Sequence, residues 1–363
     1  MKLALVHDHL NQIGGAERVL AAMHQTYPLS PLYTLVHDKR VVTDFFGRLV
    51  INTSFIQRLP FSRTRLRWYL AAMPAAVESF DLSAYDVVLS SASAFAKGAI
   101  APARAIHICY CHTPTRYLWS DSHSYAQEVG GSAIIGKILP FVLQQLRMWD
   151  YLAAQRVDRF IANSGFVAQR IKRYYNRDST VMYPPVDVHR YPALPKLNYF
   201  VLVSRLRPYK KVDIAIRAFN RLNMPLVIVG DGEARLALES IAGPNIHFAG
   251  NVDERTKKRV LAGALGFIHP QEEDFGISAV EAMAAGTPVI AYASGGALET
   301  VREGETGIFF EEQTWQSLAD AVIRAKRHSF DYARIKDHSK QFSRERFQHE
   351  LKAFIESSYA NRH

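Results

Sequence analysis

A predicted strand, an acidic loop and a predicted buried helix follow one another without a break around residue 275. This succession limits the fold more than any other part of the sequence. Phe267 and Ile268 end an apolar run typical of a strand, and residues 271–276 are too acidic and irregular to continue it. Residues 277–285 have the small and apolar side chains of a buried helix, which Gly286 ends. A strand that passes directly into a helix is the repeating unit of an open α/β sheet, and ligands bind at such turns.

Two carboxylates flank the predicted start of this helix, Glu273 in the loop and Glu281 inside the helix. The free N–H groups and the dipole of a helix N-terminus attract anions. An ionised carboxylate is in turn a strong hydrogen-bond acceptor for sugar hydroxyls. The combination predicts a site for a ligand that carries both a phosphate and a sugar. Taken alone, the segment leaves open that both glutamates only stabilise the helix N-terminus.

The segment EDFGISAVEAMAAGTPVIA, with Glu273 and Glu281 separated by seven residues, resembles the signature of the large family of retaining glycosyltransferases of GT-B fold. The resemblance implies that Glu273 and the backbone of Phe275, Gly276 and Ile277 face the donor sugar and its diphosphate, while Glu281 binds the ribose. It also implies an α/β fold with two Rossmann-like domains that face across a cleft. A C-terminal helix would cross back to the first domain.

The length of 363 residues agrees with two domains, because it exceeds what one ordinary core organises. We expect an acceptor-binding domain at residues 1–187, which ends in the proline-stiffened turn VMYPPVD, and a nucleotide-sugar domain at residues 188–342. Residues 343–363 would form the returning helix. The start MKLALVHDHL is too short and too soon charged for a signal peptide, and no apolar run reaches the ~18 residues that would indicate a membrane span.

The first domain opens as a strand, a glycine loop and a helix, with Gly14 and Gly15 in the loop. Glycines let a backbone approach a phosphate or a sugar closely. A glycine pair is weak evidence, but GGAE resembles the N-terminal loop of the same family, which implies donor binding by Gly14 and Gly15.

The segment CYCHTPTRYLW places Cys109, Cys111 and His112 close together, which could indicate a metal site. The chain has no other cysteine, so the set is incomplete and we predict no metal. Two cysteines also favour a reducing compartment. By the resemblance, His112 reaches the donor sugar from the first domain, and HTPTRYLW is similar to mannosyltransferases of surface-polysaccharide assembly.

The second domain begins with a predicted strand followed by RLRPYKK. Arg205 and Lys210 match two cations of the family's motif, although Ser204 replaces its glycine. A leaving nucleoside diphosphate gains negative charge, which two fixed cations would stabilise. Register favours Lys210 over Lys211 for this role. The loops that contain Gly230 and Val252 resemble those on the base and ribose side of the donor pocket.

Positive charge is concentrated in the first half of the chain. Residues 1–195 hold 21 Lys and Arg against 13 Asp and Glu, a net of +8, and the remainder contributes +2 to the total of +10. We find no helix-turn-helix, zinc-finger or aromatic RNA-binding signature, so nucleic acid is not a predicted partner. Residues 45–77 contain no acid but several arginines among aromatic side chains, which suits an anionic membrane surface. The residues of this predicted membrane or acceptor surface are Arg58, Arg63, Arg65, Arg67 and Trp68. A solvated face remains the alternative, and it is favoured for the second acid-free stretch, residues 129–149.

The predicted reaction is transfer of a hexose with retention of configuration. Since no Asp-x-Asp motif occurs and two cations are expected at the diphosphate, neither a metal nor another cofactor is predicted. The resemblance favours mannose from GDP-mannose, and a saccharide acceptor linked to polyprenyl diphosphate at the inner face of the cytoplasmic membrane. Glu273, His112, Arg205 and Lys210 would be the catalytic residues. A GT-B sugar-nucleotide epimerase and a non-catalytic nucleotide-sugar-binding protein are the alternatives.

Overall fold

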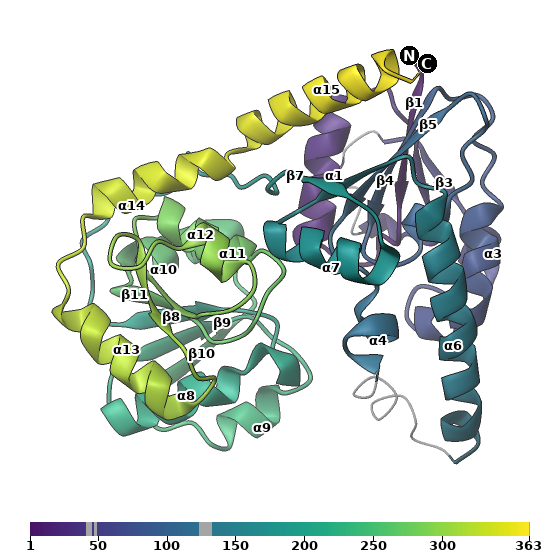
Figure 1. The fold of residues 1–363 in the computed structure, drawn as a ribbon. Coiled ribbons are helices and arrows are strands. Elements are labelled where there is room, and N and C mark those ends of the chain that lie inside the picture. The colour runs from purple at the N-terminus through teal and green to yellow at the C-terminus, as the bar shows by residue number, and fades with distance from the viewer. Residues whose placement is uncertain (41–45, 47–48, 123–132, 363) are drawn as a thin grey trace. The chain divides into compact units, whose positions relative to one another are not determined.

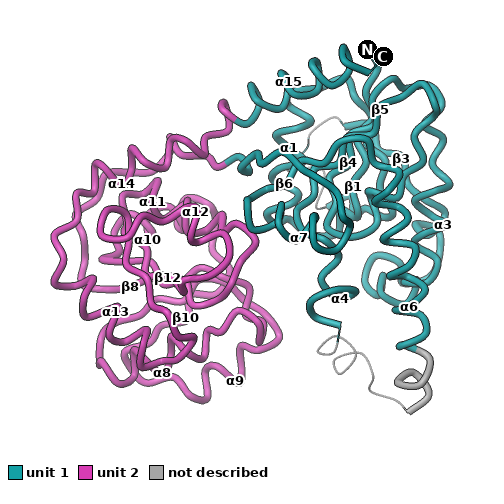
Figure 2. Tube along the Cα trace, viewed as in Figure 1, with its two compact units in different colours: residues 1–185, 347–363 teal, residues 186–346 magenta. Residues whose placement is uncertain are grey.

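The computed structural model divides the chain into two compact units (Figures 1 and 2). Unit 1 contains residues 1–185 and 347–363, and unit 2 contains residues 186–346. The division falls between Pro185 and Val186, inside VMYPPVD. The structure describes residues 1–40, 46, 49–122 and 133–362. For residues 133–138 it describes the backbone only. Arg48 and the first part of the stretch 129–149 therefore lie outside the described residues.

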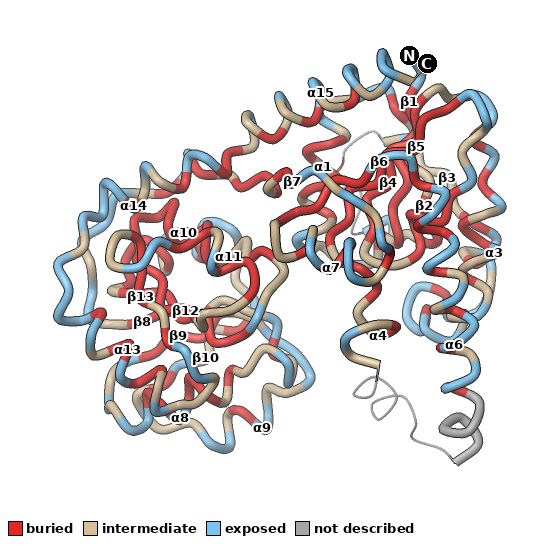
Figure 3. Tube along the Cα trace, viewed as in Figure 1, coloured by how far each residue is buried: buried red, intermediate tan, exposed pale blue. Residues whose placement is uncertain are grey.

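The described strands of unit 1 form one seven-stranded sheet in the order β3-β2-β1-β4-β5-β6-β7, with all neighbours parallel. Parallel strands are covered on both faces, which explains their continuous apolar runs and their burial (Figure 3). The strands are β1 (Leu3–His7), β2 (Leu32–Thr34), β3 (Ile51–Thr53), β4 (Val87–Ala92), β5 (Ile106–Cys111), β6 (Arg159–Ala162) and β7 (Ser179–Val181).

Helices cover both faces of this sheet. On one face α1 and α15 pack against β1, and on the other α3, α6 and α7 form a second core. The helical segments are α1 (Gly15–Thr26), η1 (Phe55–Arg58), η2 (Leu66–Ala72), α3 (Met73–Glu78), η3 (Ala96–Gly98), α4 (Arg116–Trp119), α6 (Ala133–Gln155), α7 (Gly165–Tyr175) and α15 (Arg344–Ala360). The returning C-terminal helix is confirmed, because Phe347, Leu351 and Ile355 of α15 are fully buried in the core with β1 and α1.

Unit 2 contains a parallel sheet in the order β10-β9-β8-β11-β12-β13. Numbered within the unit, this is the order 3-2-1-4-5-6 of a dinucleotide-binding fold. The strands are β8 (Phe200–Val203), β9 (Leu226–Val229), β10 (Ile246–Gly250), β11 (Gly266–His269), β12 (Val289–Tyr292) and β13 (Gly307–Phe310). The helical segments are η4 (Pro208–Lys210), α8 (Val212–Leu222), α9 (Arg235–Glu239), α10 (Glu254–Gly263), α11 (Ile277–Ala284), α12 (Ala297–Thr300), α13 (Trp315–Arg327), α14 (Tyr332–Ser339) and η5 (Lys340–Phe342).

The predicted strand at Phe267 and Ile268 is β11, and the helix predicted at residues 277–285 is α11. Strand β2 is short and ends at Thr34. The backbone beyond it still follows the chain after β1: Leu35 N donates to Asp8 O at 3.1 Å, and Leu10 N to Val36 O at 2.8 Å. Among the described residues, no helix is both long and apolar enough to cross a membrane.

A buried ion pair joins η3 to α6 in unit 1. Lys97 Nζ lies 2.5 Å from Asp150 Oδ1, and both side chains are 1% exposed. Asp150 also accepts hydrogen bonds from Thr115 Oγ1 at 2.7 Å, Trp119 Nε1 at 2.8 Å and Tyr175 OH at 2.8 Å. Asp150 therefore anchors both ends of the TRYLW part of the loop that follows β5.

Candidate functional site

Both sheets have a topological switch point, where the strand order reverses and crevices for ligands form at the carboxyl ends of the strands. In unit 2 the switch lies between β8 and β11, and in unit 1 between β1 and β4. Arg205 and Lys210 follow β8, and Glu273 follows β11. The residues predicted from two distant motifs of unit 2 thus meet at one switch point.

Lys210 and Glu273 form an ion pair at this point, between Nζ and Oε1. Gln271 Nε2 donates to the same carboxylate oxygen at 3.0 Å. Burial raises the pKa of Glu273, but Lys210, His269 and the hydrogen bond from Gln271 together outweigh burial and lower the pKa to about 2. The pair is formed by Lys210, whereas Lys211 adopts a left-handed backbone conformation at the N-cap of α8. Arg205 lies exposed at the same strand end.

The acidic loop ends at Gly276, which is the N-cap of α11 and has φ of +88°. A Cβ there would lie 3.3 Å from His269 Nε2, so glycine serves both the backbone conformation and the close approach. His269 is 1% exposed, and neither of its ring nitrogens has a hydrogen-bond partner among the described residues. The Phe275 side chain packs on Phe342 at 5.6 Å between ring centroids, so its ring belongs to the core of unit 2.

Glu281 is buried on α11 and accepts a hydrogen bond from Lys257 Nζ of α10 at 2.9 Å. Lys257 also lies 3.1 Å from the exposed carboxylate of Glu254. The ammonium of Lys257 therefore fixes the orientation of the Glu281 carboxylate. Gly230, with φ of +126°, follows β9, and a Cβ there would lie 1.9 Å from Ser204 O, so these loops require a glycine to pack. Val252 follows β10.

Unit 1 places Gly14 and His112 at the carboxyl end of its own sheet. Gly14 is the N-cap of α1, and its N–H donates to Glu17 Oε2 at 2.7 Å, while Gly15 begins the helix. His112 follows β5, and its Nε2 lies 2.8 Å from Ser91 Oγ. Burial and the neighbouring His7 lower the pKa of His112 to about 4, so the ring is neutral near pH 7. Asn163 Nδ2 donates to the His112 carbonyl at 2.8 Å and so fixes its backbone.

Comparison with known proteins assigns a domain type to each half of the chain. Residues 13–190 match the model described as Glycosyltransferase Family 4, and residues 189–342 match the model described as Glycosyl transferases group 1. Both halves of the chain carry glycosyltransferase domains. The fold is GT-B, with the family 4 domain in unit 1 and the group 1 domain in unit 2.

Two curated relatives illustrate the similarity. D-inositol 3-phosphate glycosyltransferase of Nocardioides sp. is 28% identical over 211 residues, which cover 47% of this chain and 46% of the relative. D-rhamnosyltransferase WbpZ of Pseudomonas aeruginosa is 30% identical over 173 residues, which cover 42% and 45%. The chain thus spans about half the length of the curated relatives that it matches.

Solved structures cover the chain more completely and establish the fold alone. Anabaena HepE in complex with UDP and glucose has a TM-score of 0.74 at 19% identity and covers 98% of this chain and 100% of that one. Sucrose-phosphate synthase from Thermosynechococcus elongatus has a TM-score of 0.73 at 18% identity, with 99% and 100% covered.

The family 4 domain exposes a cluster of basic and aromatic side chains between η1 and η2, which we call the basic-aromatic surface. Arg58, Arg63 and Arg67 are exposed, and Phe61 and Trp68 are 64% and 62% exposed. The guanidinium of Arg65 lies 4.5 Å from the Trp68 ring centroid and 5.8 Å from that of Phe61. Phe61 has φ of +55°, a conformation that bulky residues rarely adopt. The local fold thus presents two aromatic rings to solvent beside four arginines.

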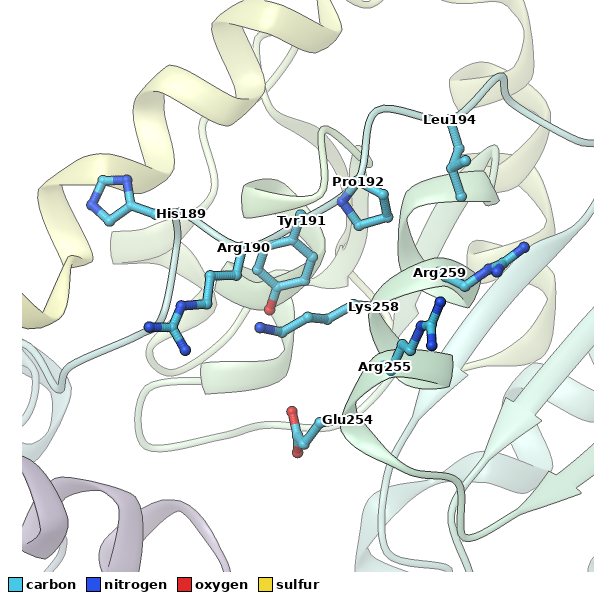
Figure 4. Close-up of a pocket in the computed structure, with 9 residues that line it drawn as sticks. All are labelled: His189, Arg190, Tyr191, Pro192, Leu194, Glu254, Arg255, Lys258 and Arg259. Carbon is cyan, nitrogen blue, oxygen red and sulfur yellow. The ribbon is translucent and has the colours of Figure 1, made fainter.

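The group 1 domain carries a second basic region without such rings, which we call the basic groove (Figure 4). It has a volume of about 630 Å³. Arg190, Arg255 and Arg259 line it and are exposed, Lys258 lies over the buried ring of Tyr191, and Glu254 is the acid among its lining residues. The groove therefore matches the basic-aromatic surface in charge but not in exposed aromatic area.

Sequence patterns did not identify Lys257, His269 or Ser91 as members of the site. Lys257 is one of two adjacent lysines in an ordinary polar helix, and only the fold shows which of them faces Glu281. His269 ends an apolar strand, where a histidine is usually part of the core. Among the described residues, no group of three or more His, Cys, Asp or Glu is placed to hold a metal ion. Cys109 and Cys111 are buried among apolar side chains of the core.

Proposed function

We propose that this chain is a retaining glycosyltransferase that moves a hexose from a nucleotide sugar to a saccharide acceptor. GDP-mannose is the first candidate donor, and the acceptor is linked to polyprenyl diphosphate. The observation that carries the proposal is the ion pair of Lys210 and Glu273 at the switch point of a group 1 domain, beside the N-terminus of α11. A cation, a carboxylate and the N-terminus of a helix then lie together, as a sugar diphosphate requires.

In the proposed reaction, the bond between the anomeric carbon and the diphosphate breaks while the acceptor oxygen bonds to that carbon on the same face. The acceptor's proton passes to the leaving phosphate. Lys210 and Arg205 stabilise the charge that develops on the diphosphate. Glu273 accepts hydrogen bonds from the sugar, Glu281 from the ribose, and neutral His112 contacts the donor sugar. This division of roles uses no resident cofactor.

The test is an assay of the purified chain with a panel of nucleotide sugars that contains GDP-mannose, UDP-glucose and UDP-N-acetylglucosamine. Release of nucleoside diphosphate together with a new glycoside is the expected result. Interconversion of free nucleotide sugars without an acceptor would identify an epimerase instead. Binding without either reaction would identify a non-catalytic protein. A thermal-shift screen selects the donor beforehand, since a ligand at 100 times its dissociation constant stabilises the protein by roughly 2.7 kcal/mol.

Glu281→Ala should weaken the binding of the nucleoside diphosphate, the product, as well as of the donor. The ribose contact is common to both ligands, and loss of a charge-assisted hydrogen bond of ~1.5–3 kcal/mol corresponds to roughly 10–100-fold in affinity. Calorimetric titration measures this change. Glu254→Ala is the matched control, because it removes the other carboxylate of Lys257 and leaves Glu281 in place. Equal affinity of both variants and the wild type would rule out the ribose contact.

A lipid-linked acceptor requires contact with a membrane, and we assign this contact to the basic-aromatic surface. Each arginine near an anionic surface contributes about 1 kcal/mol, and exposed Phe61 and Trp68 add apolar area that enters the headgroup region. Helix α6 adds apolar side chains to the exposed surface of the same unit, since Phe141, Met148 and Leu152 are exposed while Leu143 and Leu146 are buried.

Charge reversal of Arg63, Arg65 and Arg67 to glutamate should lower the affinity for vesicles of phosphatidylglycerol at least 100-fold, because three contributions of about 1 kcal/mol are lost. Sedimentation with vesicles at low salt measures the effect, and donor binding should be unchanged. The matched control reverses Arg190, Arg255 and Arg259 in the basic groove, which changes the net charge equally. If both triple variants lose binding to the same extent, or the wild type does not bind, the assignment is wrong.

A further inference from the structure

A continuous chain of polar side chains crosses the carboxyl end of the unit 1 sheet, from the glycine loop to His112. It begins where Gly14 N–H donates to Glu17 Oε2 at 2.7 Å. The other oxygen of Glu17 faces His7 Nε2 at 3.8 Å. The opposite ring nitrogen of His7 reaches Ser91, whose hydroxyl contacts His112. Glu17, His7 and Ser91 are at most 4% exposed, so water does not compete along this path.

The partners of His7 determine the direction of its hydrogen bonds. His7 Nδ1 lies 3.1 Å from the Ser91 carbonyl oxygen and 3.1 Å from Ser91 Oγ. A carbonyl oxygen can only accept, so Nδ1 of His7 carries the hydrogen. The same N–H is also the donor toward Ser91 Oγ, so its hydrogen bond is shared between the two oxygens of Ser91.

The direction set at His7 carries over to His112. Since Ser91 Oγ accepts from His7, its own hydrogen is available for His112 Nε2 at 2.8 Å. Nε2 of His112 then accepts, and in a neutral imidazole the hydrogen must reside on Nδ1. The burial that keeps this ring neutral makes the choice of tautomer chemically meaningful, because the two tautomers present opposite hydrogen-bonding character at each nitrogen.

We propose that Glu17, His7 and Ser91 are positioning residues that hold His112 as the Nδ1–H tautomer and couple its orientation to the Gly14 loop. In this arrangement, His112 offers an N–H donor to an oxygen of the donor sugar. The inference rests on the proposed function only for the role of His112, because the tautomer itself is a property of the free protein. The residues of the chain come from β1, α1 and β4, so they connect the glycine loop with His112 through three elements of unit 1.

The test combines the ring nitrogen shifts of His112 with steady-state kinetics of the full chain. Long-range ¹H–¹⁵N correlation spectra of the histidine-labelled protein report which nitrogen is protonated. In the wild type we expect Nδ1 of His112 to be protonated, and in Ser91→Ala we expect a mixture of both tautomers. Turnover should fall about 10–100-fold, as for loss of other orienting partners, with a much smaller change in KM.

Two further variants separate positioning from general damage to the fold. His7→Asn retains an N–H donor toward Ser91 and should keep the His112 tautomer and most of the turnover, whereas His7→Phe should lose both. Ser90→Ala is the matched control. Ser90 Oγ lies 2.9 Å from His107 Nε2 in an equally buried serine–histidine pair, one residue earlier on β4 and hence on the other sheet face. It should leave His112 and turnover unchanged.

Unaltered His112 shifts in Ser91→Ala would overturn the proposal, whatever the activity. An Nε2–H tautomer in the wild type would overturn it equally. A changed tautomer with unchanged turnover would uphold the hydrogen bonds from His7 to Ser91 and from Ser91 to His112, and would instead refute the contact of His112 with the donor. The spectra need no substrate, so they are decisive even if the donor is not GDP-mannose.

Discussion

Replacement of Lys210 by alanine should lower the turnover number by about 10²–10³ and change the affinity for the donor much less. The charge that Lys210 meets grows as the diphosphate leaves, so its contribution is larger in the transition state than in the bound substrate. Arg205→Ala should act in the same direction. Lys211→Ala is the matched control, because Lys211 occupies the N-cap of α8 and Lys210 forms the ion pair with Glu273.

The pH dependence of Lys210→Ala provides an independent check. In the wild type, Lys210 acts together with His269 and Gln271 to lower the pKa of Glu273 to about 2, against the effect of burial. Without the cation, burial raises this pKa, so the acid limb of the pH–rate profile should move to higher pH. The pKa of Glu273 is lower in the folded wild type than in the unfolded chain. Its ionised form therefore stabilises the fold above pH ~4.5, and this contribution is lost only as the pH falls toward about 2. Full recovery of turnover in Lys210→Ala on addition of magnesium would mean that the lysine only replaces a metal ion.

Asp150→Ala should lower the free energy of unfolding by about 3–5 kcal/mol, because it leaves the ammonium of Lys97 buried without its counter-ion. Urea unfolding measures the change. Asp178→Ala is the control, since Asp178 forms an ion pair with Lys172 in which both side chains are more than half exposed. That substitution should cost less than about 1 kcal/mol.

A double replacement distinguishes the charge from the packing at this position. Lys97→Met with Asp150→Leu removes both charges and should recover much of the lost stability, as replacement of a buried pair by apolar residues often does. Burial lowers the pKa of Lys97, but Asp150 outweighs it and raises the pKa. The contribution of this pair is therefore present below the ordinary lysine pKa and is lost as the pH rises beyond it. If Asp150→Ala has the same free energy of unfolding as the wild type, the ion pair contributes nothing to stability.

The strand–loop–helix units and the place of Glu273 beside a helix N-terminus could be predicted from local pattern, whereas the GT-B fold, Arg205 and Lys210 were predicted from the resemblance to the family's motifs. Arg205 and Lys210 follow β8, and Glu273 follows β11. Their closeness could be expected because a parallel sheet brings the carboxyl ends of its strands together. The partners of these residues could not be predicted in the same way. Lys257 reaches Glu281 from another helix, and Ser91 reaches His112 from a neighbouring strand, so each contact depends on tertiary register rather than on spacing.

The basic-aromatic surface shows a different limit of prediction. Composition indicated a basic segment with aromatic side chains. Because η1 and η2 are short and irregular, no periodic spacing of apolar residues distinguishes buried from exposed positions. The structure buries Ile56 and Leu66 and exposes Phe61 and Trp68. The left-handed backbone at Phe61, which no propensity favours, decides part of that difference.

The return of α15 to unit 1 has a consequence for synthesis on the ribosome. Phe347, Leu351 and Ile355 complete the core that β1 and α1 begin, yet residues 186–346 are translated between them. At about 5–20 residues per second, that interval lasts roughly 10–30 s. During it, unit 2 can fold while the apolar face of β1 and α1 still lacks its cover. Unit 1 thus begins to emerge from the ribosome before unit 2 and is completed after it, and the nascent chain exposes an apolar surface to chaperones until α15 has emerged.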